Sequence, residues 1–577
     1  MLTNNKIARI LYEIAEMLEI LGESRFRIIA YQKAAQIIEN LADDVIDIYA
    51  QKGEEGLIKI KGIGKSIADK IVELIKTGKI NYHQDLIKKV PSSELNLMKI
   101  PGIGPKTASK LYRYFKIKNL NELEKLARRG EIRKLPGFDI LSEKNILENI
   151  RRLKKREKRF LISFAEPIAY ECLNSLKKCK YVKKVDIVGS LRRMKETIGD
   201  IDLVASSLKP SLVINYFINL PFVKKVKNHG KTKASIIHRK NVVIDLEILP
   251  PDSYGSLLQH LTGSREHNIH LRKLANDKGF SLSEYGITCL KNNRLEKIRD
   301  EKIIYQKLGL GYIEPELRED WGEIEAAMKN NLPHLINLND IKGDLHIHTN
   351  WSEGTEDINS MANYCLKKGY SYLAITDHTK GLGIASGMDE KKILKQIREI
   401  EKIRQKITQI EIFTGAEVNI KADGSLDIDN DILSRLDIVI ASIHSSFYQS
   451  EEKMTQRLIK AIKNPFVKII GHPSGRLIKK RDSYEVDWPL VFQEAYKNNV
   501  ALEINSFPER LDLRDFLVKE AKNYGVKFAI NTDAHRSEHL QQIRYGIAVA
   551  RRGWLEKKDV INTWSTNKLK KWLTIKK

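Results

Sequence analysis

One stretch of the chain, residues 185–204, carries residue types that could transfer a phosphoryl group. Its apolar first part ends at Gly189 and Ser190, where a turn after a strand would offer backbone N–H groups and a hydroxyl to phosphate oxygens. Its last part carries Asp200 and Asp202, and the period of a strand places both carboxylates on one face. Because paired carboxylates bind divalent metals that neutralise phosphate charge, the stretch predicts a nucleotidyl-transfer site.

A third carboxylate strengthens this interpretation, because an Asp pair alone is also common at strand ends. Asp245 lies in a second apolar stretch, NVVIDLEIL, which could pair beside the first in one sheet. Three carboxylates suit a site for two metal ions. Arg192 and Arg193 add fixed positive charge beside them.

The elements before this site predict binding to DNA without sequence specificity. Helical patterns flank a G-x-G turn at Gly62 and Gly64, and the same pattern returns at Gly102 and Gly104, with a degenerate third copy at 135–150. Such a hairpin lets the second helix present its N-terminal amides to a phosphate. One glycine turn is weak evidence, but two close copies in a basic region favour a DNA-binding function.

A second group of metal-ligand residue types follows in residues 341–577. His346 and His348 lie two apart on an apolar strand, and further ligand types end later strand-like runs. These later residues are Asp377, His378, Glu417, His444, His472, Asp533 and His535. Apolar strand, ligand and helix repeat in this order, which is typical of a β/α barrel with its ligands at the carboxyl ends of parallel strands.

The first site and the hairpins resemble the family X DNA polymerases, of which DNA polymerase beta is a member, over about residues 1–320. The resemblance implies that Asp200, Asp202 and Asp245 are catalytic and hold two Mg²⁺ ions, with gapped or primer-template DNA and dNTPs as partners. It assigns Gly189, Ser190, Arg193, Thr262, Gly263 and Asn268 to the incoming nucleotide. It assigns Gly62, Gly64, Lys65, Lys70, Gly102, Gly104 and Lys106 to DNA.

Two departures from the family pattern leave activities open. Lys70 aligns with a lysine that removes deoxyribose phosphate in some members, but Ser66 and Arg27 stand where those members carry lysines. Lys70 is therefore interpreted first as a phosphate contact or a solvated lysine. The two aromatic residues that often precede the nucleotide-side turn are replaced by His260 and Leu261, so the sequence predicts no preference between dNTP and rNTP.

The second group resembles the PHP (polymerase and histidinol phosphatase) domain, a barrel phosphoesterase with up to three metals. The ligands that the resemblance implies are His346, His348, Glu353, His378, Glu417, His444, His472, Asp533 and His535. Glu353 replaces the usual Asp and reaches farther. Mixed imidazole and carboxylate ligands suit Mn²⁺, Zn²⁺ or Fe. The complete set predicts an active 3′–5′ exonuclease or 3′-end-processing phosphoesterase. Asp377, if it is not a ligand, could orient or take a proton, and the structural alternative is a hydrogen bond that supports the ligands from behind.

Length and charge agree with a multidomain DNA-binding protein. The 577 residues are too many for one core, and the net charge is +26. We expect helix-hairpin-helix domains, an α/β nucleotidyltransferase palm and a distorted β/α PHP barrel. The expected boundaries are a lyase-like domain at 1–80, a second helical domain at 81–157, the palm at 158–250, a nucleotide-side subdomain at 251–320, a linker at 321–340 and the PHP domain at 341–577.

The remaining expectations concern the cellular location, the oligomeric state and the alternative functions. Four cysteines without C-x-x-C spacing and the lack of a long apolar run predict a cytoplasmic protein without membrane contact. A monomer is also expected. The favoured function is filling short DNA gaps in repair. One alternative is a nucleotidyltransferase with a non-templated or RNA acceptor, and another is a DNA-binding scaffold whose barrel hydrolyses a small phosphate ester.

Overall fold

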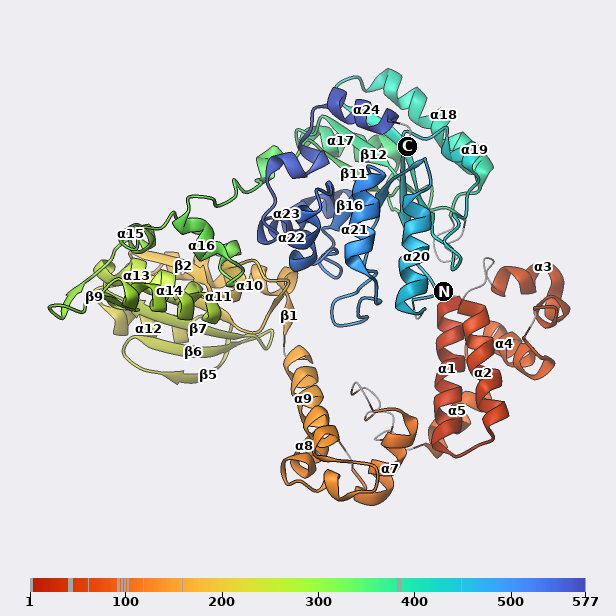
Figure 1. Cartoon of the computed structure of the whole chain (residues 1–577), viewed down its shortest axis with the longest axis horizontal. Helices are drawn as coiled ribbons and strands as arrows, with labels where there is room; N and C mark the ends of the chain where they lie inside the picture. The colour runs from red at the N-terminus through yellow and green to blue at the C-terminus, as the bar shows by residue number, and fades with distance from the viewer. Residues whose placement is uncertain are drawn as a thin grey trace.

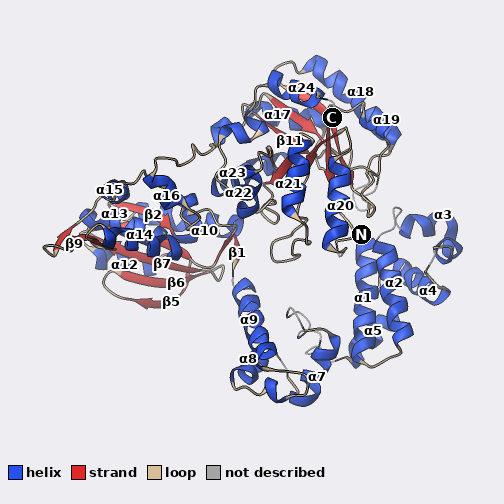
Figure 2. Cartoon of the chain, viewed as in Figure 1, coloured by secondary structure: helices blue, strands red, loops and turns tan. Residues whose placement is uncertain are grey.

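The computed structural model describes residues 4–39, 45–60, 62–90, 94, 97, 100, 103–117, 119–157, 159–380, 387–447 and 449–575. Figures 1 and 2 show a helical N-terminal part, a mixed sheet with its helices, and a C-terminal barrel. In the described part of the chain, no helix is both long and apolar enough to cross a membrane. The predicted multidomain fold class is confirmed.

The helical part contains two small cores. The first core is built by α1 (Asn4–Ile20), α2 (Arg25–Glu39), α3 (Val45–Ile58), α4 (Lys65–Thr77) and α5 (Asn81–Lys89). The second is built by α7 (Pro105–Phe115), α8 (Leu120–Arg128), η1 (Ile132–Lys134) and α9 (Ile140–Glu157). Each G-x-G turn leads into a helix, because Gly64 precedes α4 and Gly104 precedes α7. Pro105 at the first position of α7 suits a helix start, where the missing N–H has no partner to lose.

The palm is a five-stranded sheet in the order β2-β4-β7-β6-β5. Its strands are β2 (Lys184–Val188), β4 (Ile201–Ser206), β5 (Val223–His229), β6 (Lys233–His238) and β7 (Val243–Leu249). β4 and β7 are parallel, and the other neighbours are antiparallel. The short pair β1 (Phe160–Leu161) and β3 (Thr197–Ile198) lies beside the sheet, with α10 (Ile162–Lys177), α11 (Gly189–Arg192) and α12 (Pro210–Ile218). The predicted turn after β2 is thus the short helix α11.

The nucleotide-side region follows the palm. It contains η2 (Pro251–Ser253), α13 (Tyr254–Thr262), α14 (Arg265–Asp277), α15 (Glu301–Lys307) and the small antiparallel sheet of β8 (Phe280–Ser283), β9 (Gly286–Cys289) and β10 (Arg294–Glu296). The connection to the barrel holds η3 (Pro315–Leu317), α16 (Glu323–Met328) and η4 (Leu338–Asp340). Buried Arg318 joins these parts, since it donates hydrogen bonds to Glu301 and to the carbonyl of Ile313.

The C-terminal part is a nearly closed barrel of seven parallel strands. They are β11 (Gly343–Ile347), β12 (Tyr372–Ile375), β13 (Glu411–Asn419), β14 (Ile438–Ser442), β15 (Val467–Ile470), β16 (Ala501–Asn505) and β17 (Phe528–Asn531). Ile347 bridges to Ala534 just after β17, which brings the last strand back to the first. Trp564 and Trp572 pack with apolar side chains of the strands in one core.

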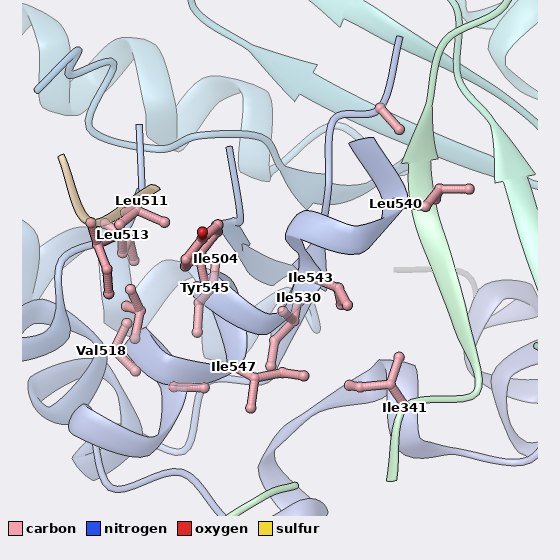
Figure 3. Close-up of a cluster of buried hydrophobic side chains, with 14 of the residues drawn as sticks. Ile341, Ile504, Leu511, Leu513, Val518, Ile530, Leu540, Ile543, Tyr545 and Ile547 are labelled. Carbon is pink, nitrogen blue, oxygen red and sulfur yellow. The ribbon is translucent and has the colours of Figure 1, made fainter. Parts of the chain in front are cut away.

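Helices cover the outside of the barrel. They are α17 (Ile358–Lys367), α18 (Glu390–Lys406), α19 (Asn430–Leu433), α20 (Glu451–Ile462), α21 (Trp488–Lys497), α22 (Asp515–Asn523), η5 (Ser537–Gln542), α23 (Ile543–Arg552), η6 (Lys557–Asp559), η7 (Ile561–Thr563) and α24 (Thr566–Thr574). Figure 3 shows Ile543 and Ile547 of α23 near Ile504 and Ile530 of β16 and β17. This apolar packing fixes the strand ends that carry the polar residues of the site.

The palm and the barrel are joined by buried ion pairs as well as by the chain. Arg552 of α23 donates hydrogen bonds to Glu319 and to the carbonyl of Arg193. Tyr545, on the same helix, donates a hydrogen bond of 2.7 Å to Glu166 of α10. The barrel therefore contacts the same short segment that carries the predicted triphosphate-binding arginine.

Two candidate metal centres

The structure brings Asp200, Asp202 and Asp245 together at one edge of the palm sheet, here called the aspartate edge. β4 and β7 are paired with Asp202 directly opposite Asp245, and Asp200 directly precedes β4. One carboxylate oxygen of each aspartate lies within 4.8 Å of the others. The parallel register is the cause, because it carries equivalent positions of two strands to the same edge.

Gly189 is required at this edge because Asp202 leaves no room for a side chain. The residue before it, Val188, is the register partner of Asp202. A Cβ at Gly189 would lie 2.2 Å from the Oδ2 atom of Asp202, and the backbone there has φ +64°. Glycine alone tolerates both conditions. Ser190 follows Gly189 within α11.

The aspartate cluster holds more negative charge than its surroundings neutralise. Burial and then the charges of Asp200 and Asp245 raise the pKa of Asp202 to about 7, although Arg193 opposes the shift. The Oδ1 atom of Asp245 is buried without a hydrogen-bond partner. Carboxylate oxygens without partners and with mutual repulsion are what a hard divalent cation would bind, so the residues fit such an ion.

The two arginines of this segment reach the predicted nucleotide-side turn. Arg193 donates a hydrogen bond to the carbonyl of Thr262 and one of 2.9 Å to Glu319. Arg192 donates one of 2.6 Å to the hydroxyl of Thr262 and pairs with Glu301. Gly263 has φ +66°, and a Cβ there would lie 3.1 Å from Arg193. The structure thus places Arg193, Thr262 and Gly263 together.

Asn268 is held within the nucleotide-side helices in this structure. Its side chain accepts a hydrogen bond of 2.8 Å from Gln259 and donates one of 2.7 Å to the carbonyl of His260. Contact with a base pair would require it to leave these partners. Its predicted role toward the nucleotide therefore depends on a rearrangement of α13 and α14.

The predicted DNA-binding residues lie at the hairpins where the structure describes them. Gly62 has φ +100°, and a Cβ there would lie 2.3 Å from Ile37. Lys65 begins α4. Lys70, on the same helix, donates hydrogen bonds of 3.0 Å to the carbonyl and to the hydroxyl of Ser66. Gly104 precedes α7. Gly102 and the side chain of Lys106 lie outside the described residues.

Burial lowers the pKa of Lys70, and its ammonium lies 5.3 Å from the centre of the Tyr82 ring. Tyr82 also stacks with Tyr31, which is buried. Lys70 is thus a half-buried lysine against an aromatic pair rather than a fully solvated one.

The barrel gathers its histidines and carboxylates at the carboxyl ends of the strands. Three groups have ligand atoms mutually within 4.8 Å. They are His348, Glu353, His378 and His535; His346, His348 and Asp533; and His378, Glu417 and His444. His472 joins the last group, because its Nε2 lies 3.0 Å from Glu417. The structure therefore brings all nine predicted ligands into one cluster.

Glu417 lies at the centre of this cluster. Its carboxylate is 2.8 Å from His378 Nδ1, 3.3 Å from His444 Nε2 and 3.4 Å from His346 Nε2. Burial opposes its charge, but the positive charges of His378 and His346 hold its pKa well below the usual range. A carboxylate surrounded by several imidazoles would hold metal ions together with them.

Glu353 uses its extra length to reach two histidines. Its Oε1 lies 2.9 Å from His378 Nε2 and 2.7 Å from His535 Nε2. The substitution of Glu for the usual Asp therefore still places a carboxylate among the ligands.

Several buried ligand atoms in the cluster have no partner in hydrogen-bond geometry, although His378 Nδ1 and Glu417 Oε2 lie only 2.8 Å apart. These atoms are His346 Nε2, both ring nitrogens of His348, His378 Nδ1, His472 Nδ1, Glu353 Oε2 and Glu417 Oε2. Buried polar atoms without partners are costly. Because imidazole nitrogens and carboxylate oxygens together suit transition metals, this set fits the group that the sequence implied.

A buried carboxylate behind the ligands was missed by the sequence interpretation. Glu503 on β16 lies 2.7 Å from His346 Nδ1 and accepts a hydrogen bond of 2.7 Å from the backbone N–H of His472. Such a partner fixes the tautomer and orientation of a ligand. The signal was present, since Glu503 is a charged residue inside the apolar run VALEIN.

Asp377 acts as a fixed acceptor in this structure. It accepts hydrogen bonds from the N–H and hydroxyl of Thr349, from Ser352 and from Gln396, all between 2.6 and 2.7 Å. It thereby holds the loop that follows His348. Of the roles considered for Asp377, these contacts favour the structural alternative, a hydrogen bond that supports the ligands from behind.

Four family comparisons cover successive parts of the chain. Residues 2–80 match the Helix-hairpin-helix domain and residues 94–152 the SAM-like Helix-hairpin-helix tandem. Residues 257–319 match the DNA polymerase beta thumb, and residues 344–507 match the PHP domain. The order agrees with the helical, nucleotide-side and barrel regions of the structure.

Two relatives resemble the chain to different extents. It is 37% identical over 561 residues to the DNA polymerase/3′-5′ exonuclease PolX of Bacillus subtilis (strain 168), with 97% of each chain covered. It is also 33% identical over 245 residues to a probable phosphatase of Thermoanaerobacter sp. (strain X514), which covers 41% of this chain and 95% of that protein. Full-length similarity to the first, together with the aspartate edge and the histidine cluster, places this chain in the family X DNA polymerases with a C-terminal PHP domain.

Proposed function

We propose that the chain is a DNA-directed DNA polymerase that fills short gaps during DNA repair and trims 3′ ends with its barrel. The observation that supports polymerisation most strongly is the aspartate edge beside Arg193, Thr262 and Gly263. It combines metal-binding carboxylates with positive charge and a glycine turn, which is what an incoming dNTP needs. Two basic hairpin domains precede it and would hold the DNA on both sides of a gap.

In the proposed reaction, the primer 3′-hydroxyl attacks the α-phosphorus of the dNTP and pyrophosphate leaves. Two Mg²⁺ ions bound by the three aspartates would supply charge neutralisation and an acidified hydroxyl. The chain itself would orient the triphosphate, with Gly189 giving close backbone approach and Ser190 and Arg193 contacting phosphate oxygens. Arg193 would exchange Glu319 for the nucleotide, since both compete for the same guanidinium.

For the barrel, we propose a 3′–5′ exonuclease with up to three Mn²⁺, Zn²⁺ or Fe ions. These ions would supply a hydroxide at neutral pH. Glu503 would keep His346 in one tautomer, and Asp377 would hold the loop after His348. All parts needed for both reactions lie in one chain, so we propose that a monomer performs them.

The polymerase proposal is tested on gapped DNA with dNTPs and Mg²⁺. Asp200→Ala removes an exposed carboxylate of the aspartate edge, and we expect incorporation to fall by at least about a thousandfold, because metal charge stabilisation is worth several kcal/mol. Mn²⁺-dependent degradation of a 3′ end should persist in the same preparation. Equal incorporation by Asp200→Ala and the wild type would refute the assignment. Similar rates on gapped and single-stranded DNA would favour a non-templated acceptor instead.

The nuclease proposal is tested by the reciprocal variant. His346→Ala should abolish 3′-end degradation and leave gap filling intact. Retained degradation would assign the activity to another site. The similarity to probable phosphatases favours a second candidate, hydrolysis of a small phosphate ester. Purified protein that releases phosphate from histidinol phosphate but no nucleotide from a 3′ end would support that candidate.

A further inference from the structure

A positively charged cavity lies between the palm and the barrel, outside both metal centres. Its volume is about 260 Å³, and five positive and two negative side chains line it. Arg159 and Thr197 come from the palm side, and Arg476 and Arg514 come from the barrel side. The excess of positive charge in a partly open cavity indicates an anionic ligand.

Arg476 is the most deeply buried of these side chains. Its exposed fraction is 1%, and its Nη2 pairs with Glu196 at 2.7 Å and bonds to the carbonyl of Leu511. Its Nε and Nη1 atoms have no hydrogen-bond partner. A buried guanidinium with two free donors is costly unless an acceptor joins it.

Two further arginines offer donors to the same cavity. The Nε of Arg514 is also buried without a hydrogen-bond partner. Arg159 bonds through Nε to the Thr197 hydroxyl at 2.8 Å, and its Nη1 lies 3.2 Å from where a Cβ of Gly199 would be. Gly199 directly precedes Asp200, so Arg159 connects the cavity with the aspartate edge.

The size of the cavity restricts the ligand. Sites for whole organic ligands usually measure about 300 to 1,000 Å³, so a nucleotide with its base is too large for about 260 Å³. A single phosphate group fits, and the planar guanidinium is the side chain best matched to phosphate oxygens. The cavity chemistry is therefore that of one phosphate.

We propose that Arg159, Arg476 and Arg514 bind one phosphodiester of a DNA strand that extends from the polymerase centre toward the barrel. The position supports this source. Thr197 lies three residues before Asp200, and Arg476 lies four residues after His472, so the cavity adjoins segments of both centres. This inference rests on the proposed function, and the alternative source of the same chemistry is free phosphate or pyrophosphate.

The test measures binding of a fluorescent single-stranded oligodeoxynucleotide in EDTA by anisotropy over a range of salt. Arg514→Gln and Arg159→Gln should each weaken binding about tenfold and reduce the slope of log affinity against log salt by about 0.7, the value for one phosphate of a single strand. Arg514→Lys should recover part of the affinity. Lys480→Gln is the matched control, because Lys480 is exposed and pairs with Glu509 outside this cavity. Circular dichroism and thermal melting verify folding of each variant.

A second measurement identifies the phosphate. A single uncharged methylphosphonate is moved one position at a time along the 3′-terminal part of the oligonucleotide. One position should weaken binding to the wild type about tenfold and have no further effect on Arg514→Gln. Unchanged salt slopes in both folded variants, or the absence of such a position, would overturn the proposal.

Inorganic pyrophosphate tests the alternative ligand of the cavity, which is free phosphate or pyrophosphate. Pyrophosphate could raise the melting temperature of the wild type but not of Arg514→Gln, while the salt dependence of DNA binding is the same in both proteins. In that case the cavity binds a free phosphate compound and not a DNA strand. Because binding is measured without turnover, loss of the cavity effect is distinct from failure of the proposed function, which would appear as wild-type protein inactive on gapped DNA.

Discussion

The two candidate metal centres differ in how the negative charge of their carboxylates is balanced. At the aspartate edge, three carboxylates face one another, and the pKa of Asp202 rises to about 7 because burial and its neighbours disfavour its charge. In the barrel, imidazoles surround the carboxylates, and the pKa values of Glu417 and Asp533 stay well below their usual range. The proton that competes with a metal ion is thus bound by a carboxylate at the aspartate edge and by an imidazole in the barrel.

This difference bears on what each centre can do without metal. The barrel cluster neutralises itself, since burial disfavours charge on His378 but Glu417 and Glu353 raise its pKa to about 10. The aspartate edge depends on an external cation for the same balance. A carboxylate removed from the barrel should therefore destabilise the protein, whereas one neutralised at the palm edge should stabilise it.

The largest effect is expected for Glu417→Gln. Gln keeps the shape but removes the charge that His378, His444 and His346 share, so bound metal should be lost and the free energy of unfolding should fall by about 3 to 5 kcal/mol. Metal content by mass spectrometry and thermal melting measure both. Glu411→Gln, at the start of the same strand and paired with Lys570, is the control. Wild-type metal content in Glu417→Gln would contradict the assignment of Glu417 as a metal ligand.

Glu503→Gln should have the next largest effect. It weakens the contact that orients His346 without removing a ligand, and loss of such a contact typically lowers metal affinity about 10- to 100-fold. Competition with a coloured chelator measures this affinity, and Glu509→Gln serves as an exposed control. Unchanged affinity would mean that the barrel fixes His346 by packing alone.

The sequence predicted the ligands of both centres better than the contacts between them. Strand periodicity and spacing were enough to place Asp202 and Asp245 on paired strands, whereas Asp200, which was expected on the same strand as Asp202, lies in the bend just before β4. Glu503 was missed because a single charged residue in an apolar run is also typical of a strand residue with its side chain in solvent, so the signal in VALEIN does not identify a partner of a ligand. The fold class was predictable for the same reason, since alternating strands and helices allow few architectures.

The contacts between the palm and the barrel could not be predicted. Arg552 and Glu319 are far apart in the sequence and meet through packing of α23 against the connecting segment. Long-range pairings of this kind depend on how whole domains dock, and local patterns carry no signal for them.

The pH dependence of gap filling tests whether a proton on Asp202 competes with Mg²⁺ at the aspartate edge. A proton on Asp202 competes with Mg²⁺, so the Mg²⁺ concentration for half-maximal incorporation should rise about tenfold per pH unit below about 7 and level off above it. Initial rates against Mg²⁺ at several pH values measure this, with DNA binding in EDTA at the same pH values as the control. A Mg²⁺ requirement that does not change with pH would show that Asp202 stays ionised.

The smallest effect, and the one of opposite sign to Glu417→Gln, is expected for Asp202→Asn in EDTA. The pKa of Asp202 is raised on folding, so the folded protein carries an electrostatic penalty that is complete above about pH 7 and disappears as pH falls toward 4. Asn removes this penalty at every pH. We therefore expect about 1 kcal/mol of added stability at pH 8, because partial exposure reduces the effect, and no gain at pH 4.

Thermal melting at both pH values measures the gain, and Asp252→Asn, an exposed residue paired with Arg299, should give at most a small loss. Added Mg²⁺ should reverse the order, because it binds the wild-type edge more tightly and so stabilises it more. A destabilised Asp202→Asn protein in EDTA at pH 8 would mean that the aspartate edge is balanced without metal, as the barrel is. The two centres would then differ in their ligands but not in how they hold their charge.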